Sequence, residues 1–194
     1  MAYSTTSVRA ADSLRSISGE ILGVVERLTH ESGEDLGRAA DRIRTAARVF
    51  VLGAGRSGLA VQMTAMRLMH LGLDVHVVGD ATTPAVTGRD VLLVASGSGT
   101  TAGIVRAAST AAGVGAGVVA ITTDRTSPLA ELADVIIVIP AATKQDHAGM
   151  LSAQYSGGLF EQSLVLVGDA LFDALWKTSG ATAEELWPRH ANLE

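Results

Sequence analysis

Val91-Leu92-Leu93-Val94-Ala95 runs directly into Ser96-Gly97-Ser98-Gly99-Thr100-Thr101. The apolar run predicts a buried strand, and the spacing after Thr101 predicts a helix, so hydroxyls and glycines fall where the strand ends. Such a position offers free backbone N–H groups and the positive end of a helix dipole, which suits a phosphate. We therefore expect the 96–101 loop to bind a phosphate group. The alternative is an ordinary turn in which Thr100 or Thr101 only caps the helix.

The same alternation continues on both sides of this loop. Four further apolar runs predict strands, and helical patterns separate most of them. The predicted strands are 48–52, 75–78, 91–95, 117–122 and 135–139, and the predicted helices are 57–71, 101–112 and a short 127–132. The interval 79–89, rich in Thr and Gly, is too broken for a full crossover helix. This order predicts an α/β fold with a five-stranded parallel sheet in a three-layer α-β-α arrangement, with ligands at the carboxyl ends of the strands.

Helices are also expected outside the sheet region. Two amphipathic patterns, over 9–32 and 34–47, precede the first strand. A long helix from Gly157 to about Thr178 is apolar nearly all round, which favours a subunit interface. Within 57–71 we expect an inward face of large side chains: Leu59, Met63, Met66 and Met69 or His70. We treat 1–194 as one domain, divided into N-terminal helices (1–47), sheet core (48–140) and a loop, helix and tail (141–194).

Composition excludes several classes of protein. The 194 residues carry a net charge of −5 and 4% aromatic residues, which argues against a nucleic-acid partner. There are no cysteines, hence no disulfides or thiolate metal sites. No apolar stretch is long enough for a membrane span, and the first residues lack the apolar core of a signal peptide. A cytoplasmic protein is expected, and the high apolar content of 47% favours an oligomer.

A second glycine loop, Gly53-Ala-Gly-Arg-Ser-Gly58, satisfies the G-x-G-x-x-G pattern of dinucleotide-binding folds. Asp80 follows at a suitable distance to bind a ribose hydroxyl. The short interval after the second strand, the polar pair Arg56-Ser57 and the lack of length for a substrate domain weigh against NAD(P). We therefore expect no cofactor, and no His and carboxylate set has the spacing of a metal site.

The two loops resemble those of SIS (sugar isomerase) domains, whose phosphosugar loop is written S-x-S-G-x-T. Two more segments resemble one SIS group, the 6-phospho-3-hexuloisomerases of the ribulose monophosphate pathway. They are Gly-Gly-Leu-Phe-Glu-Gln at 157–162 and Arg-His-Ala-Asn-Leu-Glu at 189–194. The family has Gln-Pro-Met-Gly where this chain has Gln154-Tyr-Ser-Gly-Gly158. The resemblance implies a flavodoxin-like SIS fold with two extra N-terminal helices and a homotetramer whose subunits share active sites. It also implies conversion of D-arabino-hex-3-ulose 6-phosphate to D-fructose 6-phosphate without a cofactor.

Moving a carbonyl between adjacent carbons needs a base, and Glu161 and His190 are the predicted catalytic residues. Glu161 falls in the first turn of the late helix, where the dipole favours an ionised carboxylate. On the residues alone, a Glu that only stabilises the helix start is the stronger alternative; the resemblance favours catalysis. For His190, an ordinary histidine in a disordered tail is the stronger alternative on the residues alone; the resemblance favours a role in ring opening or carbonyl polarisation, reaching a neighbouring subunit. The predicted substrate contacts are Gly55, Arg56, Ser57, Ser96, Gly97, Ser98, Gly99, Thr100, Thr101, Gln154 and Arg189.

Roles for Lys144 and His147 stay open, since Lys144 suits a phosphate and a surface ion pair equally well. Three other functions also stay open. They are another SIS isomerase, such as one for arabinose 5-phosphate, a non-catalytic phosphosugar sensor, and the NAD(P) protein.

Overall fold

The computed structural model describes residues 9–141 and 152–193 of the chain. Its centre is a five-stranded parallel sheet in the order β2-β1-β3-β4-β5. The strands are β1 (Val49–Gly53), β2 (Val75–Val77), β3 (Val91–Ala95), β4 (Gly117–Thr122) and β5 (Val135–Val138). The order reverses between β1 and β3, so the loops after these two strands flank the topological switch point. The predicted parallel α/β sheet is confirmed.

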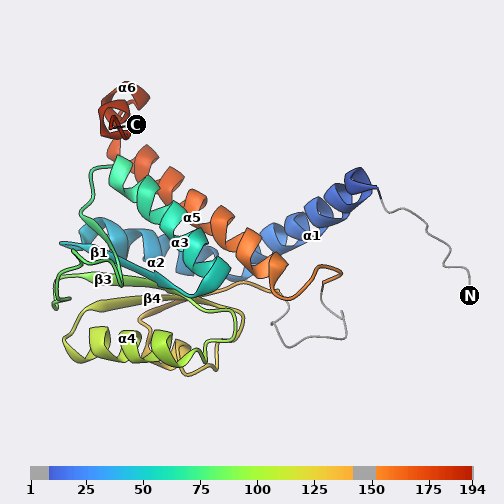
Figure 1. Cartoon of the computed structure of the whole chain (residues 1–194), viewed down its shortest axis with the longest axis horizontal. Helices are drawn as coiled ribbons and strands as arrows, with labels where there is room; N and C mark the ends of the chain where they lie inside the picture. Colours follow the sequence, from blue (N-terminus) through green and yellow to red (C-terminus); the bar gives the residue numbers. More distant parts are fainter. Residues whose placement is uncertain (1–8, 142–151, 194) are drawn as a thin grey trace, which may run out of the picture.

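Helices cover both faces of the sheet (Figure 1). One face carries α1 (Ala10–Glu31), α2 (Gly33–Thr45), α3 (Gly55–His70) and α5 (Gly158–Ser179). The other carries α4 (Ala102–Gly113) and the short η1 (Ala130–Leu132). The small α6 (Ala183–Leu186) and η2 (Trp187–Arg189) follow α5 at its far end. None of the helices among the described residues combines the length and apolar content needed to cross a membrane.

Strand β3 shows why the sheet needs two covered faces. All five of its side chains are buried. Leu93 and its neighbours two residues away belong to the core under α3 and α5, whereas Leu92 and Val94 belong to the core under α4. Because successive strand side chains point to opposite faces, an unbroken apolar run requires a cover on each side.

The expected inner face of α3 is wrong. Leu59, Met63 and Met66 are about half exposed or more, and Met69 is also exposed; of the candidates only His70 is buried. The helix instead buries mostly small residues together with Leu68 and His70, and Thr64 lies so close to Gly168 of α5 that a side chain at 168 would collide with it. Close packing between α3 and α5 therefore selects small residues where the two helices touch, and Leu59 and the three methionines face outward.

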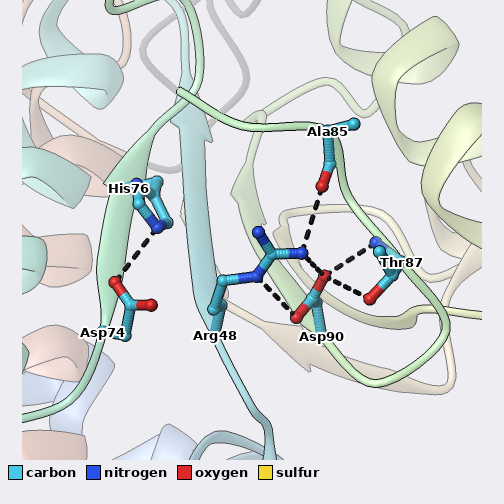
Figure 2. A network of polar contacts seen from close by, with 6 residues as sticks. All are labelled: Arg48, Asp74, His76, Ala85, Thr87 and Asp90. Carbon is cyan, nitrogen blue, oxygen red and sulfur yellow. Dashed lines mark hydrogen bonds and ion pairs between the residues drawn. The ribbon is translucent and has the colours of Figure 1, made fainter. Parts of the chain in front are cut away.

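The segment between β2 and β3 contains no helix, as its composition predicts. It is fastened to β1 by an ion pair at the amino-terminal edge of the sheet (Figure 2). Arg48 Nη2 lies 2.7 Å from Asp90 Oδ2, and Asp90 also accepts hydrogen bonds from the backbone and hydroxyl of Thr87. The Asp90 side chain is fully buried. This network stands at the opposite edge of the sheet from the glycine loops, so it holds the fold rather than a ligand.

Candidate functional site

The 96–101 loop is held by the end of β4. The Gly97 carbonyl accepts hydrogen bonds from the backbone and hydroxyl of Thr123 and from the hydroxyl of Thr122. Gly99 has a φ of +62°, and an added Cβ would lie 2.1 Å from Ser127 Oγ. Only glycine fits that position, because both the left-handed backbone and the space exclude a side chain. The loop is therefore a rigid turn whose shape is set by its neighbours.

Its hydroxyls do not act as helix caps. Thr101 occupies the N-cap position of α4, but its side chain makes no capping hydrogen bond. Its hydroxyl lies 3.1 Å from that of Ser96, and Ser98 Oγ accepts a hydrogen bond from the Thr100 hydroxyl. The hydroxyls thus gather at the helix start beside the free N–H groups of the first turn. This arrangement suits an anion, and the expected capping by Thr101 is not observed. Binding of a phosphate by the loop stays a prediction.

The glycines of the first loop have a structural reason. An added Cβ on Gly53 would lie 2.9 Å from Gly58 N, and one on Gly58 would lie 2.8 Å from Gly53 O. The pair lets α3 begin directly against β1, with Gly55 at a φ of +57°. This close approach explains two of the three glycines of the G-x-G-x-x-G pattern without a dinucleotide. It also places Arg56 and the buried Ser57 in the first turn of α3.

Glu161 joins the two loops. It is 5% exposed in the first turn of α5, and its Oε2 lies 3.2 Å from Arg56 Nη1. The preceding residue, Phe160, contacts the 96–101 loop: an added Cβ on Gly97 would lie 3.5 Å from its ring. A buried carboxylate, a guanidinium and the hydroxyl loop thus come together at the carboxyl edge of the sheet.

Gln154 lies close to Arg56, and its side chain is held by Glu20, which no sequence pattern singles out. Glu20 of α1 accepts hydrogen bonds from Ser152 Oγ (2.6 Å), the Ala153 backbone (3.0 Å) and Gln154 Nε2 (3.1 Å). Burial acts to raise the pKa of Glu20, but these hydrogen bonds together lower it below the usual value. In the sequence Glu20 is one acid within a long amphipathic helix, and only the fold brings it to residues 152–154.

A cavity of about 560 Å³ opens beside these residues. Arg56, Gln154, Tyr155 and Gly158 line one side of it, and the first half of α1 lines the other. Its size lies within the range of small-molecule sites. Arg56 lines the cavity and also contacts Glu161, whereas neither Glu161 nor the 96–101 loop is among the residues that line it.

The structure does not bring the C-terminal tail to Glu161 of the same chain. Arg189 donates a hydrogen bond to the His70 carbonyl, and the ring of His190 stacks on that of His70 at 4.0 Å. Burial first, then the charges of His190 and Arg67, lower the pKa of His70. His70 ends α3 while Arg56 begins it, and a helix of 16 residues spans about 24 Å. The tail therefore lies at the far end of α3 and α5 from Glu161 (Figure 1).

Two candidates fall elsewhere. Lys144 and His147 lie outside the described residues. Within the parts of the chain that the structure describes, no three His, Asp or Glu side chains gather as metal ligands.

The comparisons with known proteins show the family of the chain. The SIS domain model matches residues 42–165. The chain belongs to the SIS domain family. A Mycobacterium gastri protein named 3-hexulose-6-phosphate isomerase is 57% identical over 161 residues, which are 83% of this chain and 81% of that protein. A Bacillus subtilis protein of the same name is 38% identical, over 84% of this chain and 89% of its own.

A solved structure from Methanococcus jannaschii, described as inferring a 3-hexulose-6-phosphate isomerase function, has a TM-score of 0.81 at 29% identity. It covers 94% of this chain and 99% of its own. Among SIS proteins, this chain therefore groups with the 3-hexulose-6-phosphate isomerases, and the family resemblance expected from the two loops and the two later segments is confirmed.

Proposed function

We propose that this SIS protein is an isomerase that interconverts D-arabino-hex-3-ulose 6-phosphate and D-fructose 6-phosphate through an enediolate. The observation that carries the proposal is the buried Glu161 carboxylate, in contact with Arg56 at the carboxyl edge of the sheet. The names of its relatives point to the same reaction. Its place in formaldehyde assimilation or detoxification by the ribulose monophosphate pathway, and a cytoplasmic location, stay predictions.

The chemistry follows from the positions of the two charged groups. Glu161 takes the proton from C2 of the hex-3-ulose, and electrons move into a C2–C3 double bond while the C3 carbonyl oxygen becomes an enediolate oxygen. Arg56 stabilises the negative charge on the enediolate. Glu161 then returns the proton to C3, the O2 proton moves to O3, and the carbonyl is left at C2. One carboxylate serves both steps, because C2 and C3 are adjacent and the Glu161 side chain itself is buried.

The 96–101 loop supplies the anchor for the phosphate. Its hydroxyls and the first-turn N–H groups of α4 bind the dianion, while Gly55, Arg56, Ser57 and Gln154 contact the sugar end. Anchoring the phosphate uses binding energy far from the reacting carbons to place C2 beside the base.

The proposal includes a homotetramer in which Arg189 and His190 complete the site of a neighbouring subunit. The tail lies too far along α3 to serve Glu161 of its own chain. In support, α3 presents Leu59, Met63 and Met66 on one exposed stripe, and Leu166 of α5 is also exposed. Large apolar side chains that gather on one surface favour contact with another protein.

The test is incubation with D-arabino-hex-3-ulose 6-phosphate and coupled detection of fructose 6-phosphate. Arabinose 5-phosphate, in a second reaction, tests the alternative SIS isomerase. Turnover of the hexulose phosphate alone supports the proposal. Binding of both sugar phosphates by a folded oligomer without turnover of either would overturn it in favour of a sensor.

A further inference from the structure

Helix α1, which precedes the first strand, lines the cavity at the site. Ser13, Ser16 and Ile17 line the cavity opposite Arg56 and Gln154. Ser16, Ile17 and Glu20 lie three, four and seven residues after Ser13, so the four side chains share one face of α1. This face is directed to the cavity and to residues 152–154.

Glu20 fixes the turn that leads into α5. Its two carboxylate oxygens accept from a hydroxyl, a backbone N–H and a side-chain amide, and Ser152 Oγ also accepts from the Gln154 backbone at 3.0 Å. The carboxyl and the turn are more than 130 residues apart in the chain. A charged acceptor with three donors is a strong local constraint, because hydrogen bonds to ionised groups are stronger than neutral ones.

The carboxylate also decides which end of the Gln154 amide faces the site. An ionised carboxylate can only accept, so it binds the Gln154 NH₂ group and not its oxygen. Gln154 Oε1 is then placed beside Gly158, where an added Cβ would lie 3.3 Å from that oxygen and 3.9 Å from Arg56 Nη1. The acceptor oxygen of Gln154 and the donor Arg56 thus flank the same glycine at the start of α5.

We propose that Glu20 is a positioning residue that orients the Gln154 amide, so that its oxygen accepts a hydrogen bond from a sugar hydroxyl. The effect is on substrate recognition, since Glu20 acts through Gln154 and does not touch the reacting carbons. The choice of ligand rests on the proposed function; the link between Glu20 and Gln154 does not.

The kinetic test compares Glu20→Gln, Gln154→Ala and the double variant, with the hexulose phosphate as substrate. A glutamine at 20 can bind either end of the Gln154 amide, so the fixed orientation is lost. We expect KM to rise about tenfold in each single variant and kcat to change less. The double variant should be no worse than the poorer single one, because both changes remove one interaction. Glu26→Gln, the same change at an exposed site on the same helix, should leave KM unaltered.

Wild-type KM in Glu20→Gln, or KM effects that multiply in the double variant, would overturn the proposal. A second measurement needs no activity: the side-chain amide resonances of Gln154 in ¹⁵N-labelled protein, compared between wild type and Glu20→Gln. The two Gln154 side-chain amide resonances should shift in Glu20→Gln and keep their positions in Glu26→Gln. Unchanged resonances in Glu20→Gln would also contradict the proposed link between Glu20 and Gln154. If the wild type turned over no hexulose phosphate while these resonances shifted, the proposed function alone would fail.

Discussion

Glu161 combines burial with a cationic neighbour, and this combination defines its expected behaviour. Replacing it with glutamine keeps the size of the side chain but removes the group that moves the proton. We expect Glu161→Gln to bind fructose 6-phosphate nearly as well as wild type and to lower kcat by about 10²- to 10⁴-fold. Titration calorimetry and the coupled assay measure the two effects. Asp169→Asn, which changes an exposed acid on the same helix, is the matched control. Near-normal turnover of Glu161→Gln would show that Glu161 is not the catalytic base.

Gly99 makes the anchor loop testable at a single residue. An alanine there would bring Cβ within 2.1 Å of Ser127 Oγ, on a backbone with a φ of +62°. We expect Gly99→Ala to lower the free energy of unfolding by about 1–3 kcal/mol and to raise KM for the sugar phosphate. Urea unfolding and the coupled assay report the two effects. Gly37→Ala, in a helix with open space around the added Cβ, should show neither, and an unchanged KM in Gly99→Ala would contradict the anchor role.

At the scale of elements, the Arg48–Asp90 network makes the helix-free segment 78–90 part of the fold. The hydrogen bonds from Arg48, opposed by burial and aided by Thr87, lower the pKa of Asp90 from 3.8 to about 2. Because the folded-state pKa is depressed, the stabilisation is complete above pH 3.8 and is lost as the pH falls from 3.8 toward 2. The difference between the two pKa values of Asp90, unfolded and folded, corresponds to about 2 kcal/mol of folding stability.

We therefore expect Asp90→Asn to be less stable than wild type by about 2 kcal/mol at pH 7, and the gap to narrow as the pH falls below 4. Urea unfolding at a fixed protein concentration measures it, since an oligomer's stability depends on concentration. Asp41→Asn, which removes an exposed i,i+3 pair in α2, should cost little at any pH. If the difference in unfolding free energy between wild type and Asp90→Asn stayed constant down to pH 2.5, the ionised form of Asp90 would not be the source of the stability.

The elements themselves were largely predictable, because strands buried on both faces appear as apolar runs. The strand Gly117–Thr122 has the predicted ends, and the late helix, predicted over Gly157 to about Thr178, spans Gly158–Ser179. The α3 face was not predictable from hydrophobicity, since the distance to α5 favours small residues inside. The role of Glu20 was also not predictable, because its partners come from a contact between the first helix and residues 152–154, and no local sequence pattern indicates that contact.

At the scale of the whole molecule, the position of the tail is the central question. His190 stacks on His70 at the end of α3, far from Glu161 of its own chain. If the tail serves a neighbouring subunit, one complete site needs Glu161 from one chain and Arg189 and His190 from another. Removing residues 189–194 should then lower activity with little loss of stability, because residues 189–193 lie exposed on the surface.

Mixing two inactive variants distinguishes a site that two subunits share from a site built within one chain. Glu161→Gln keeps its tail, and a chain that lacks 189–194 keeps its Glu161, so a mixed oligomer contains complete sites only if the tail crosses between subunits. We expect activity to return when the two are unfolded and refolded together, and to stay absent when each is refolded alone. The same mixture made with a Glu161→Gln chain that also carries His190→Ala is the control, because it has no intact tail to donate. If the mixture stayed inactive although native mass spectrometry showed mixed oligomers, Glu161 and the tail could not come from different chains.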